Sequence, residues 1–201
     1  MPQFHADSAA RTLVLGSTSV YRRELLSRLQ VPFTVEAPHV DETPQAGELP
    51  DPLARRLAEA KARSVAERHP AAIVIGSDQV ADLDGEPLGK PGNHANAVEQ
   101  LTRMSGKVVV FQTALSVVCL ESGFAQHDLA AVRVRFRELS REEIEAYLHK
   151  EQPYDCAGSA KSEGLGIALL DAIDSDDPTA LVGLPLIRTC RMLRAAGLRV
   201  F

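Results

Sequence analysis

Two acidic residues in this sequence could activate water or hold a divalent cation. Asp78 follows the apolar run VIGS, and Glu42 ends the triplet VDE within an acidic loop. We expect Asp78 at the end of a buried strand, and strand ends are where α/β proteins usually bind ligands. Polyphosphate hydrolysis needs acidic groups for a divalent cation and a base that activates water. The alternative is that both acids are merely solvated, which is the commoner fate of Asp and Glu.

Several cations could neutralise a phosphate chain. In GSTSVYRR, small residues separate a strand from a helix, so backbone N–H groups at the helix start are free to bind an anion. Arg22 and Arg23 in the first turn oppose the helix dipole unless an anion joins them. Lys90 lies in GKP, and Lys61 lies within an amphipathic helix. Each could also be an ordinary solvated cation, so both interpretations stay open.

A glycine-rich stretch, AGSAKSEGLG at residues 157–166, carries Lys161 and Glu163. Glycines allow the backbone to approach a ligand closely, although a flexible surface loop has the same composition. The six histidines are scattered along the chain and form no set. A zinc site or a Ser-His-Asp triad therefore has little support from the sequence.

The elements that would position these residues alternate between strands and helices, which predicts an α/β fold with a mixed sheet. Residues 107–120 and 124–139 resemble a long antiparallel hairpin. The expected strands cover residues 12–15, 31–38, 71–78, 107–120, 124–139 and 166–170. Ser19 and Asn93 are expected helix N-caps, and Ser140 with Glu143 forms a capping box.

Two further local signals locate a helix and a turn. Asp51 and Pro52 are expected as the N-cap and first-turn proline of a helix that runs to about His69. The dipeptide Asp84-Gly85 predicts a hairpin turn. We find no repeat or linker in the 201 residues, so we expect an N-terminal extension at residues 1–11 and a single domain at 12–201.

The composition limits the partners and the compartment. The net charge of −5 argues against a nucleic-acid polymer or an anionic membrane as partner, but leaves room for a small anionic ligand. Three widely spaced cysteines, Cys119, Cys156 and Cys190, predict free thiols in a reducing compartment. There is no signal-peptide pattern and no membrane-length apolar run. We therefore expect a cytoplasmic location.

Taken together and in order, these stretches resemble the Maf family of nucleotide pyrophosphatases, and most of all its 7-methyl-GTP pyrophosphatase branch. The resemblance extends from about residue 12 to residue 196, and one departure is Val20, where the family usually has proline. The matching motifs are STSVYRRELL, VDE, AEAKA, IGSDQV, GKP, LTRMSGKVV, CAGSAKSEGLG and VGLPL.

The resemblance implies roles for eight residues. Asp78 would accept the proton of water, and Glu42 would contact a divalent metal, Mg²⁺ or Mn²⁺. Phosphate contacts would come from Arg22, Lys61 and Lys90. The three positions that separate the branches of the family by substrate are Tyr21, Gln79 and Glu163.

The resemblance also implies an elongated mixed sheet flanked by helices, related to the inosine triphosphate pyrophosphatases, with two lobes around a central cleft. Members are often homodimers. The implied reaction is hydrolysis of the α–β phosphoanhydride of 7-methyl-GTP to 7-methyl-GMP and pyrophosphate, a housecleaning of modified nucleotides. Two alternatives remain: a dTTP/UTP pyrophosphatase of the same family, and a nucleotide-binding division regulator without significant turnover.

Overall fold

The computed structural model describes residues 11–201, so the expected N-terminal extension, apart from Arg11, lies outside the described residues. Within residues 11–201, seven strands form one mixed sheet in the order β2-β1-β3-β5-β6-β7, with β4 paired to β3. The strands are β1 (Leu13–Gly16), β2 (Thr34–Glu36), β3 (Ile73–Leu83), β4 (Glu86–Leu88), β5 (Val108–Cys119), β6 (Phe124–Phe136) and β7 (Leu170–Asp174). The predicted α/β class with a mixed sheet is confirmed.

Strand β3 has two different neighbours on one side. Its first half runs parallel to β1, with Gly16 level with Gly76, and its second half runs antiparallel to β4 from Ala81 onward. On the other side β5 pairs with β3 along most of its length, from Val74 to Asp82. Residues 77–80 therefore have a strand neighbour on the β5 side alone, and the sheet is forked there.

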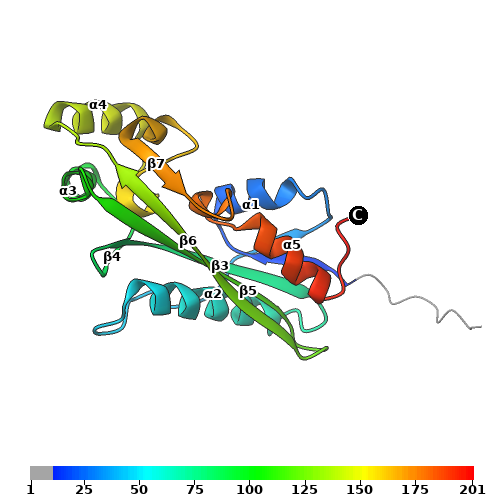
Figure 1. Cartoon of the computed structure of the whole chain (residues 1–201). Coiled ribbons are helices and arrows are strands. Elements are labelled where there is room, and N and C mark those ends of the chain that lie inside the picture. Colours follow the sequence, from blue (N-terminus) through cyan, green and yellow to red (C-terminus); the bar gives the residue numbers. More distant parts are fainter. Residues whose placement is uncertain (1–10) are drawn as a thin grey trace, which may run out of the picture.

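Five α-helices in the described part of the chain cover the sheet on both faces (Figure 1). Helix α2 packs below β3 and β5, while α1 and α5 lie above one end of the sheet and α3 and α4 lie beside the other end. The helices are α1 (Val20–Ser27), α2 (Pro50–Ala66), α3 (His94–Met104), α4 (Arg141–Glu151) and α5 (Leu186–Ala195). The molecule is elongated along the β5–β6 hairpin, as expected.

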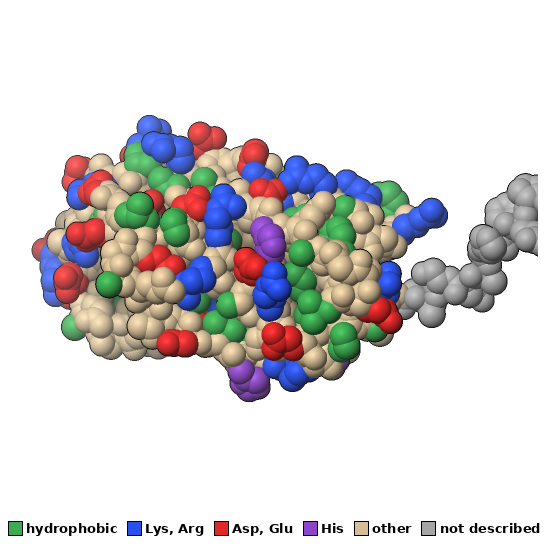
Figure 2. All heavy atoms as spheres, turned by 90° about the horizontal axis from the view of Figure 1, so that it is seen from below, with side chains coloured by type: hydrophobic (Ala, Val, Ile, Leu, Met, Phe, Trp, Pro, Cys, Tyr) green, Lys and Arg blue, Asp and Glu red, His purple; other side chains and the backbone are tan. Residues whose placement is uncertain are grey.

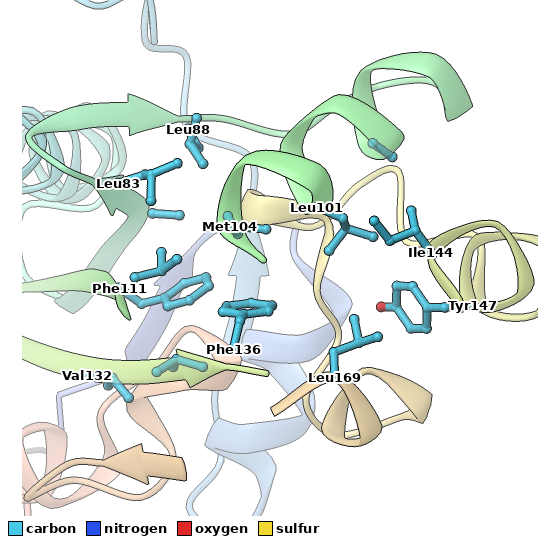
Figure 3. Packing of buried hydrophobic residues seen from close by; sticks show 14 of the residues in the cluster. Leu83, Leu88, Leu101, Met104, Phe111, Val132, Phe136, Ile144, Tyr147 and Leu169 are labelled. Atoms are coloured by element: carbon cyan, nitrogen blue, oxygen red, sulfur yellow. The ribbon is translucent and has the colours of Figure 1, made fainter. Parts of the chain in front are cut away.

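The core divides into clusters along this long axis. At one end, α3 and α4 pack on the sheet through Leu101, Ile144 and Tyr147, which meet Phe111 and Phe136 (Figure 3). At the other end α1 and α5 cover a second cluster, and α2 covers two more on the opposite face. Burial of these apolar side chains is the main force that attaches the helices to the sheet.

Most local signals in the sequence have the expected structural result. The side chains of Ser19 and Asn93 cap α1 and α3, and the Ser140–Glu143 capping box opens α4. Asp84-Gly85 forms the β3–β4 turn, with both residues at positive φ (56° and 88°). These features depend on neighbours within four residues, so the sequence alone could predict them.

Two expectations about local structure were wrong. Helix α2 covers Pro50–Ala66, and it begins at Pro50 because the fixed φ of proline suits the first residue of a helix. Asp51 is therefore not the N-cap but lies inside the helix, where its Oδ1 accepts a hydrogen bond from Arg55 Nε at 2.6 Å. The strand expected at residues 166–170 is not formed there, apart from its last residue. A 3₁₀ helix covers Leu165–Leu169, with Ile167 N–H donating to the Gly164 carbonyl and Leu170 N–H donating to the Ile167 carbonyl, and β7 begins only at Leu170.

The surface below α2 mixes charges of both signs. Figure 2 shows acidic and basic side chains interspersed on this face, without a broad basic field of the kind that binds nucleic acid. Within residues 11–201, no helix has the length and apolar character needed to cross a membrane.

Candidate active site

A cavity of about 500 Å³ lies at the fork of the sheet. Its walls come from the start of α1, the acidic loop before α2, the middle of β3, the Gly89-Lys90 loop, and the segments 155–163 and 181–183. The eight residues singled out from the sequence all line it: Tyr21, Arg22, Glu42, Lys61, Asp78, Gln79, Lys90 and Glu163. The structure thus brings together residues that are up to 142 positions apart in the sequence.

Asp78 does not lie at a strand end, contrary to our expectation. It is the sixth residue of the eleven-residue strand β3, and it is exposed to a cavity because β1 ends beside Gly76 and β4 pairs with β3 only from Ala81 onward. Consecutive strand residues point to opposite faces. Asp78 and Gln79 can line one cavity only because the neighbouring strand is missing at the fork.

A buried lysine connects the two acids. Lys61 Nζ lies 2.7 Å from Asp78 Oδ1 and 2.9 Å from Glu42 Oε1, with Lys61 5% and Asp78 6% exposed. Within residues 11–201 the Asp78 side chain accepts this one hydrogen bond, so Oδ2 is left for another donor. The position of Lys61 follows from α2, whose other inward residues, such as Leu57 and Val65, pack on β3 and β5.

Arg22 extends from the first turn of α1 across the cavity. Its Nε donates to the Gly183 carbonyl at 2.8 Å, and its Nη1 lies 3.5 Å from Ser17 Oγ. Burial lowers the pKa of the Arg22 guanidinium, whereas the nearby Asp78 and Glu42 raise it. Arginine stays protonated after such a shift, so the group remains a fixed cation. Arg23, its neighbour, is exposed and does not line the cavity.

The amide of Gln79 is held by a turn that is distant in sequence. Its Nε2 donates to Thr113 Oγ1 at 2.9 Å and lies 3.0 and 2.9 Å from the carbonyl oxygens of Ala180 and Leu181. Carbonyl oxygens can only accept, so this end of the amide must be the nitrogen. Gln79, which lines the cavity, therefore has Oε1 left as an acceptor for a ligand, whereas its amide nitrogen is already bonded.

Tyr21 forms an aromatic wall beside several polar groups. Lys161 Nζ lies 5.5 Å from the ring centroid, and the Tyr21 hydroxyl lies 3.4 Å from Asp155 Oδ2. Partial burial, with smaller effects of Cys156 and Asp155, raises the pKa of Tyr21, so the phenol stays neutral. Glu163 is exposed, lines the same cavity and is close enough to Tyr21 for its charge to raise the pKa of the phenol further.

Lys90 lies on a loop that is hydrogen-bonded to two neighbouring segments. The carbonyl of Gly89 accepts hydrogen bonds from Gly158 N–H and from Gln100 Nε2. These bonds attach the GKP loop to the 157–159 turn and to α3, and the exposed Lys90 of this loop lines the cavity.

Several cavity residues were not singled out as site residues. Ser17 and Thr18 precede α1, and Asp155 and Cys156 precede the glycine-rich stretch. Burial, and then Asp155, raises the pKa of the Cys156 thiol to about 12. The small residues before α1 had indicated an anion site, but no local pattern could have placed Asp155 against Tyr21.

The cavity contains donors that suit a hard divalent cation. Glu42 and Asp78 each contact Lys61 Nζ through one carboxylate oxygen, Oε1 and Oδ1, so the second oxygen of each acid could bind a cation beside the lysine. Mg²⁺ and Mn²⁺ prefer such oxygen ligands, which fits the expected metal.

An α/β protein with cations and carboxylates in a forked sheet belongs to the class that can bind a phosphorylated ligand. The family model described as Maf-like protein matches residues 12–196, and the chain belongs to this family.

Relatives in three bacteria all bear the name 7-methyl-GTP pyrophosphatase. The protein from Albidiferax ferrireducens is 70% identical over 94% of this chain and 96% of its own length. The protein from Polaromonas sp. is 70% identical over 96% of this chain and 88% of its own. A third, from Methylobacillus flagellatus, is 58% identical over 94% of this chain and 98% of its own length.

Proposed function

We propose that this chain is a nucleoside triphosphate pyrophosphatase that hydrolyses the α–β phosphoanhydride of 7-methyl-GTP to 7-methyl-GMP and pyrophosphate. The observation that carries the proposal is the convergence of a buried acid, fixed cations and an aromatic wall in one cavity. The names of relatives up to 70% identical support the same substrate.

Asp78 is the proposed base. Water adds to the α-phosphorus while its proton passes to Asp78 Oδ2, the bond from that phosphorus to the bridging oxygen breaks, and pyrophosphate leaves with the bridging oxygen. Lys61 holds the carboxylate through Oδ1, which fixes its orientation and leaves Oδ2 for the water. A carboxylate needs the right position before anything else to act as a general base.

The phosphate chain would be neutralised by Arg22, Lys61 and Lys90. Arg22 is anchored through Nε at Gly183, so its remaining guanidinium N–H groups can contact phosphate oxygens. Glu42, with Asp78 nearby, would hold Mg²⁺ or Mn²⁺. When bound, that ion would supply charge stabilisation for the phosphoryl oxygens.

Tyr21, Gln79 and Glu163 are proposed to select the base. The 7-methylguanine ring is cationic, and an aromatic face attracts a cation by about 0.5–2 kcal/mol. The Glu163 carboxylate can accept from the guanine N1–H and amino group while opposing the positive charge. Gln79, which presents Oε1, would accept a further donor. A pyrimidine nucleotide lacks both the cation and the paired donors.

The direct test replaces the proposed base. Asp78→Asn should lower kcat for 7-methyl-GTP by about 10²–10⁴-fold with metal present. The matched control is Asp82→Asn, on the same strand but outside the cavity lining, which should keep normal turnover. Near-normal turnover by Asp78→Asn, in a sample that still binds the nucleotide, would remove Asp78 as the base.

A nucleotide panel separates the two alternatives. Pyrophosphate release from 7-methyl-GTP, GTP, dTTP, UTP and CTP should be fastest with 7-methyl-GTP. A clear preference for dTTP or UTP would favour the other branch of the family. Binding without pyrophosphate release at saturating metal would instead favour a division regulator.

Three broader expectations belong to the same proposal. The enzyme would act in the cytoplasm, where it would remove modified nucleotides, and it would work as a homodimer. Its partner would be a small nucleotide and not a nucleic-acid polymer or a membrane, in keeping with a net charge of −5.

A further inference from the structure

Two histidines that are 55 residues apart meet at one glutamate, outside the cavity. His94 begins α3, and Glu145 and His149 lie one turn apart on α4. Glu145 Oε2 lies 2.6 Å from His94 Nε2 and 3.9 Å from His149 Nε2. One ligand atom from each residue lies within 4.8 Å of the others. Scattered histidines in the sequence were little support for a zinc site, but the packing of α3 on α4 brings two of them to one carboxylate.

Surrounding groups orient two of these side chains, His94 and Glu145, in the way that metal ligands require. His94 Nδ1 lies 3.0 Å from the Tyr154 hydroxyl, which can accept a hydrogen bond from Nδ1–H, so that Nε2, the nitrogen facing Glu145, is the one able to bind a metal. Arg141 contacts the other oxygen of Glu145, Oε1, at 2.7 Å. Outer partners of this kind fix the tautomer of a ligating histidine and the direction of a ligating carboxylate.

A histidine–glutamate ion pair alone explains only part of this arrangement. A proton shared between His94 and Glu145 accounts for their 2.6 Å contact, but His149 is too far from Glu145 to hydrogen-bond, and its ring centroid is 5.0 Å from that of His94. In a tetrahedral zinc site, neighbouring ligand atoms are roughly 3.4 Å apart, as bond lengths near 2.1 Å require. The observed separations lie on both sides of this value, so small side-chain rotations would suffice.

We propose that His94, Glu145 and His149 form a Zn²⁺ site, with water in the fourth position. Two imidazoles and one carboxylate favour Zn²⁺ over Mg²⁺, which prefers oxygen ligands. The site does not depend on the proposed function. Its location still matters for the cavity, because Tyr154 directly precedes the cavity residues Asp155 and Cys156, and Gly92 N–H donates to the Tyr154 carbonyl.

The site is supported by a rigid base. Leu101 of α3 and Ile144 and Tyr147 of α4 belong to one buried cluster, which sets the relative position of the two helices (Figure 3). His149 itself is 75% exposed, so it can rotate toward a cation and can be replaced without disturbing the core. A bound ion would join α3 to α4 and raise the stability of the native state, since any ligand that binds only the folded chain does so.

The experiment titrates Zn²⁺ alone into the full chain by calorimetry, comparing wild type with His149→Ala and with His127→Ala. His127 is an exposed histidine on β6, so its variant is the matched control. Wild type and His127→Ala should bind the same number of zinc equivalents. His149→Ala should bind one zinc ion fewer, or bind that ion about 100-fold more weakly, because the loss of even an outer partner of a ligand lowers metal affinity by about 10–100-fold.

Two further readouts complete the test. Saturating Zn²⁺ should raise the Tm of wild type by about 5 °C and that of His149→Ala by clearly less. Excess Mg²⁺ should not displace the ion from this site. Equal zinc stoichiometry and affinity in wild type and His149→Ala would overturn the proposal, as would displacement by Mg²⁺.

Discussion

At the scale of single residues, the proposed chemistry depends on which polar atoms of the site residues are already hydrogen-bonded within the protein and which can still bind a ligand. One carboxylate oxygen of Asp78, Oδ1, accepts a hydrogen bond from Lys61, and the other, Oδ2, remains available. The amide nitrogen of Gln79 donates to Thr113 and to the 180–181 turn, so its oxygen remains available as an acceptor. Both side chains are therefore fixed in direction before any substrate binds, which lowers the ordering cost of a productive complex.

The aromatic ring at position 21 is expected to favour a cationic base. Tyr21→Leu removes the ring and should lower kcat/KM for 7-methyl-GTP by about 2–30-fold, as the cation–π range implies. The value of kcat/KM for GTP, whose base is uncharged, should fall less in the same variant. Steady-state kinetics with both nucleotides give the ratio of the two kcat/KM values in wild type and variant. Tyr21→Phe keeps the ring and is the control, and an equal loss for both substrates in Tyr21→Leu would contradict the cation–π argument.

At the scale of elements, the site depends on α2 lying very close to β3. A Cβ added at Gly76 would lie 2.4 Å from the Ala58 carbonyl oxygen and 2.5 Å from Ala62 N, both in the backbone of α2. Backbone atoms cannot move aside as a flexible side chain can. The glycine thus sets the depth at which α2 places Lys61 against Asp78.

Replacement of that glycine should separate α2 from the sheet. Gly76→Ala is expected to lower the free energy of unfolding by about 1–3 kcal/mol or more through overpacking. Urea denaturation gives the value. Gly89→Ala is the matched control, because a Cβ there meets nothing within 4 Å and its φ is not positive. Equal stability of the two variants would show that α2 is free to shift.

The acidic loop is attached to α2 by a pair that should respond to pH. Arg56 donates to Glu48 through Nε at 2.6 Å and Nη2 at 2.7 Å, and these bonds lower the pKa of Glu48 to about 2. A glutamate in the unfolded chain has a pKa of about 4.3. The pair therefore stabilises the fold above about pH 4.3, and this contribution is lost as the pH falls toward 2.

Glu48→Gln tests this pH dependence. The stability difference between wild type and variant should be constant from pH 7 to about pH 5 and should shrink as the pH falls toward 2. Urea denaturation across this range measures it. Glu24→Gln changes an exposed acid that forms no ion pair within residues 11–201 and should match wild type throughout. A difference that grows on acidification would contradict the assignment.

At the scale of the whole molecule, one sheet connects both ends. Strands β3 and β5 contribute buried residues to clusters at both ends, among them Ile75 and Leu83 of β3 and Phe111 and Val117 of β5. The cavity lies where these clusters meet, with Leu88 from one and Val182 beside the other. The two lobes are thus parts of one continuous structure.

This continuity predicts a single cooperative unfolding transition for the proposed single domain. Far-UV circular dichroism and the near-UV signal of the three tyrosines should give the same midpoint in urea, because neither lobe can keep its core once β3 and β5 separate. Separate midpoints would indicate two domains. The molar mass in solution, measured by light scattering, should be twice that of the chain if the proposed homodimer forms.

The sequence by itself determined the features that act over a few residues. The caps at Ser19, Asn93 and Ser140, the turn at Asp84-Gly85 and the α/β alternation were predictable, because backbone groups there bond to near neighbours. The residue types able to bind phosphate or a metal were also evident in the sequence. A list of such residues does not say which of them face one another.

Only the tertiary structure decided how these groups meet. It placed Asp78 in mid-strand at a fork, set Lys61 between two acids, and brought His94 to Glu145. It also formed a 3₁₀ helix at Leu165–Leu169 where the apolar run had indicated a strand. Each result depends on strand ends and helix packing between segments distant in the chain. Local propensity carries no information about such contacts, since they are selected by the burial of the whole core.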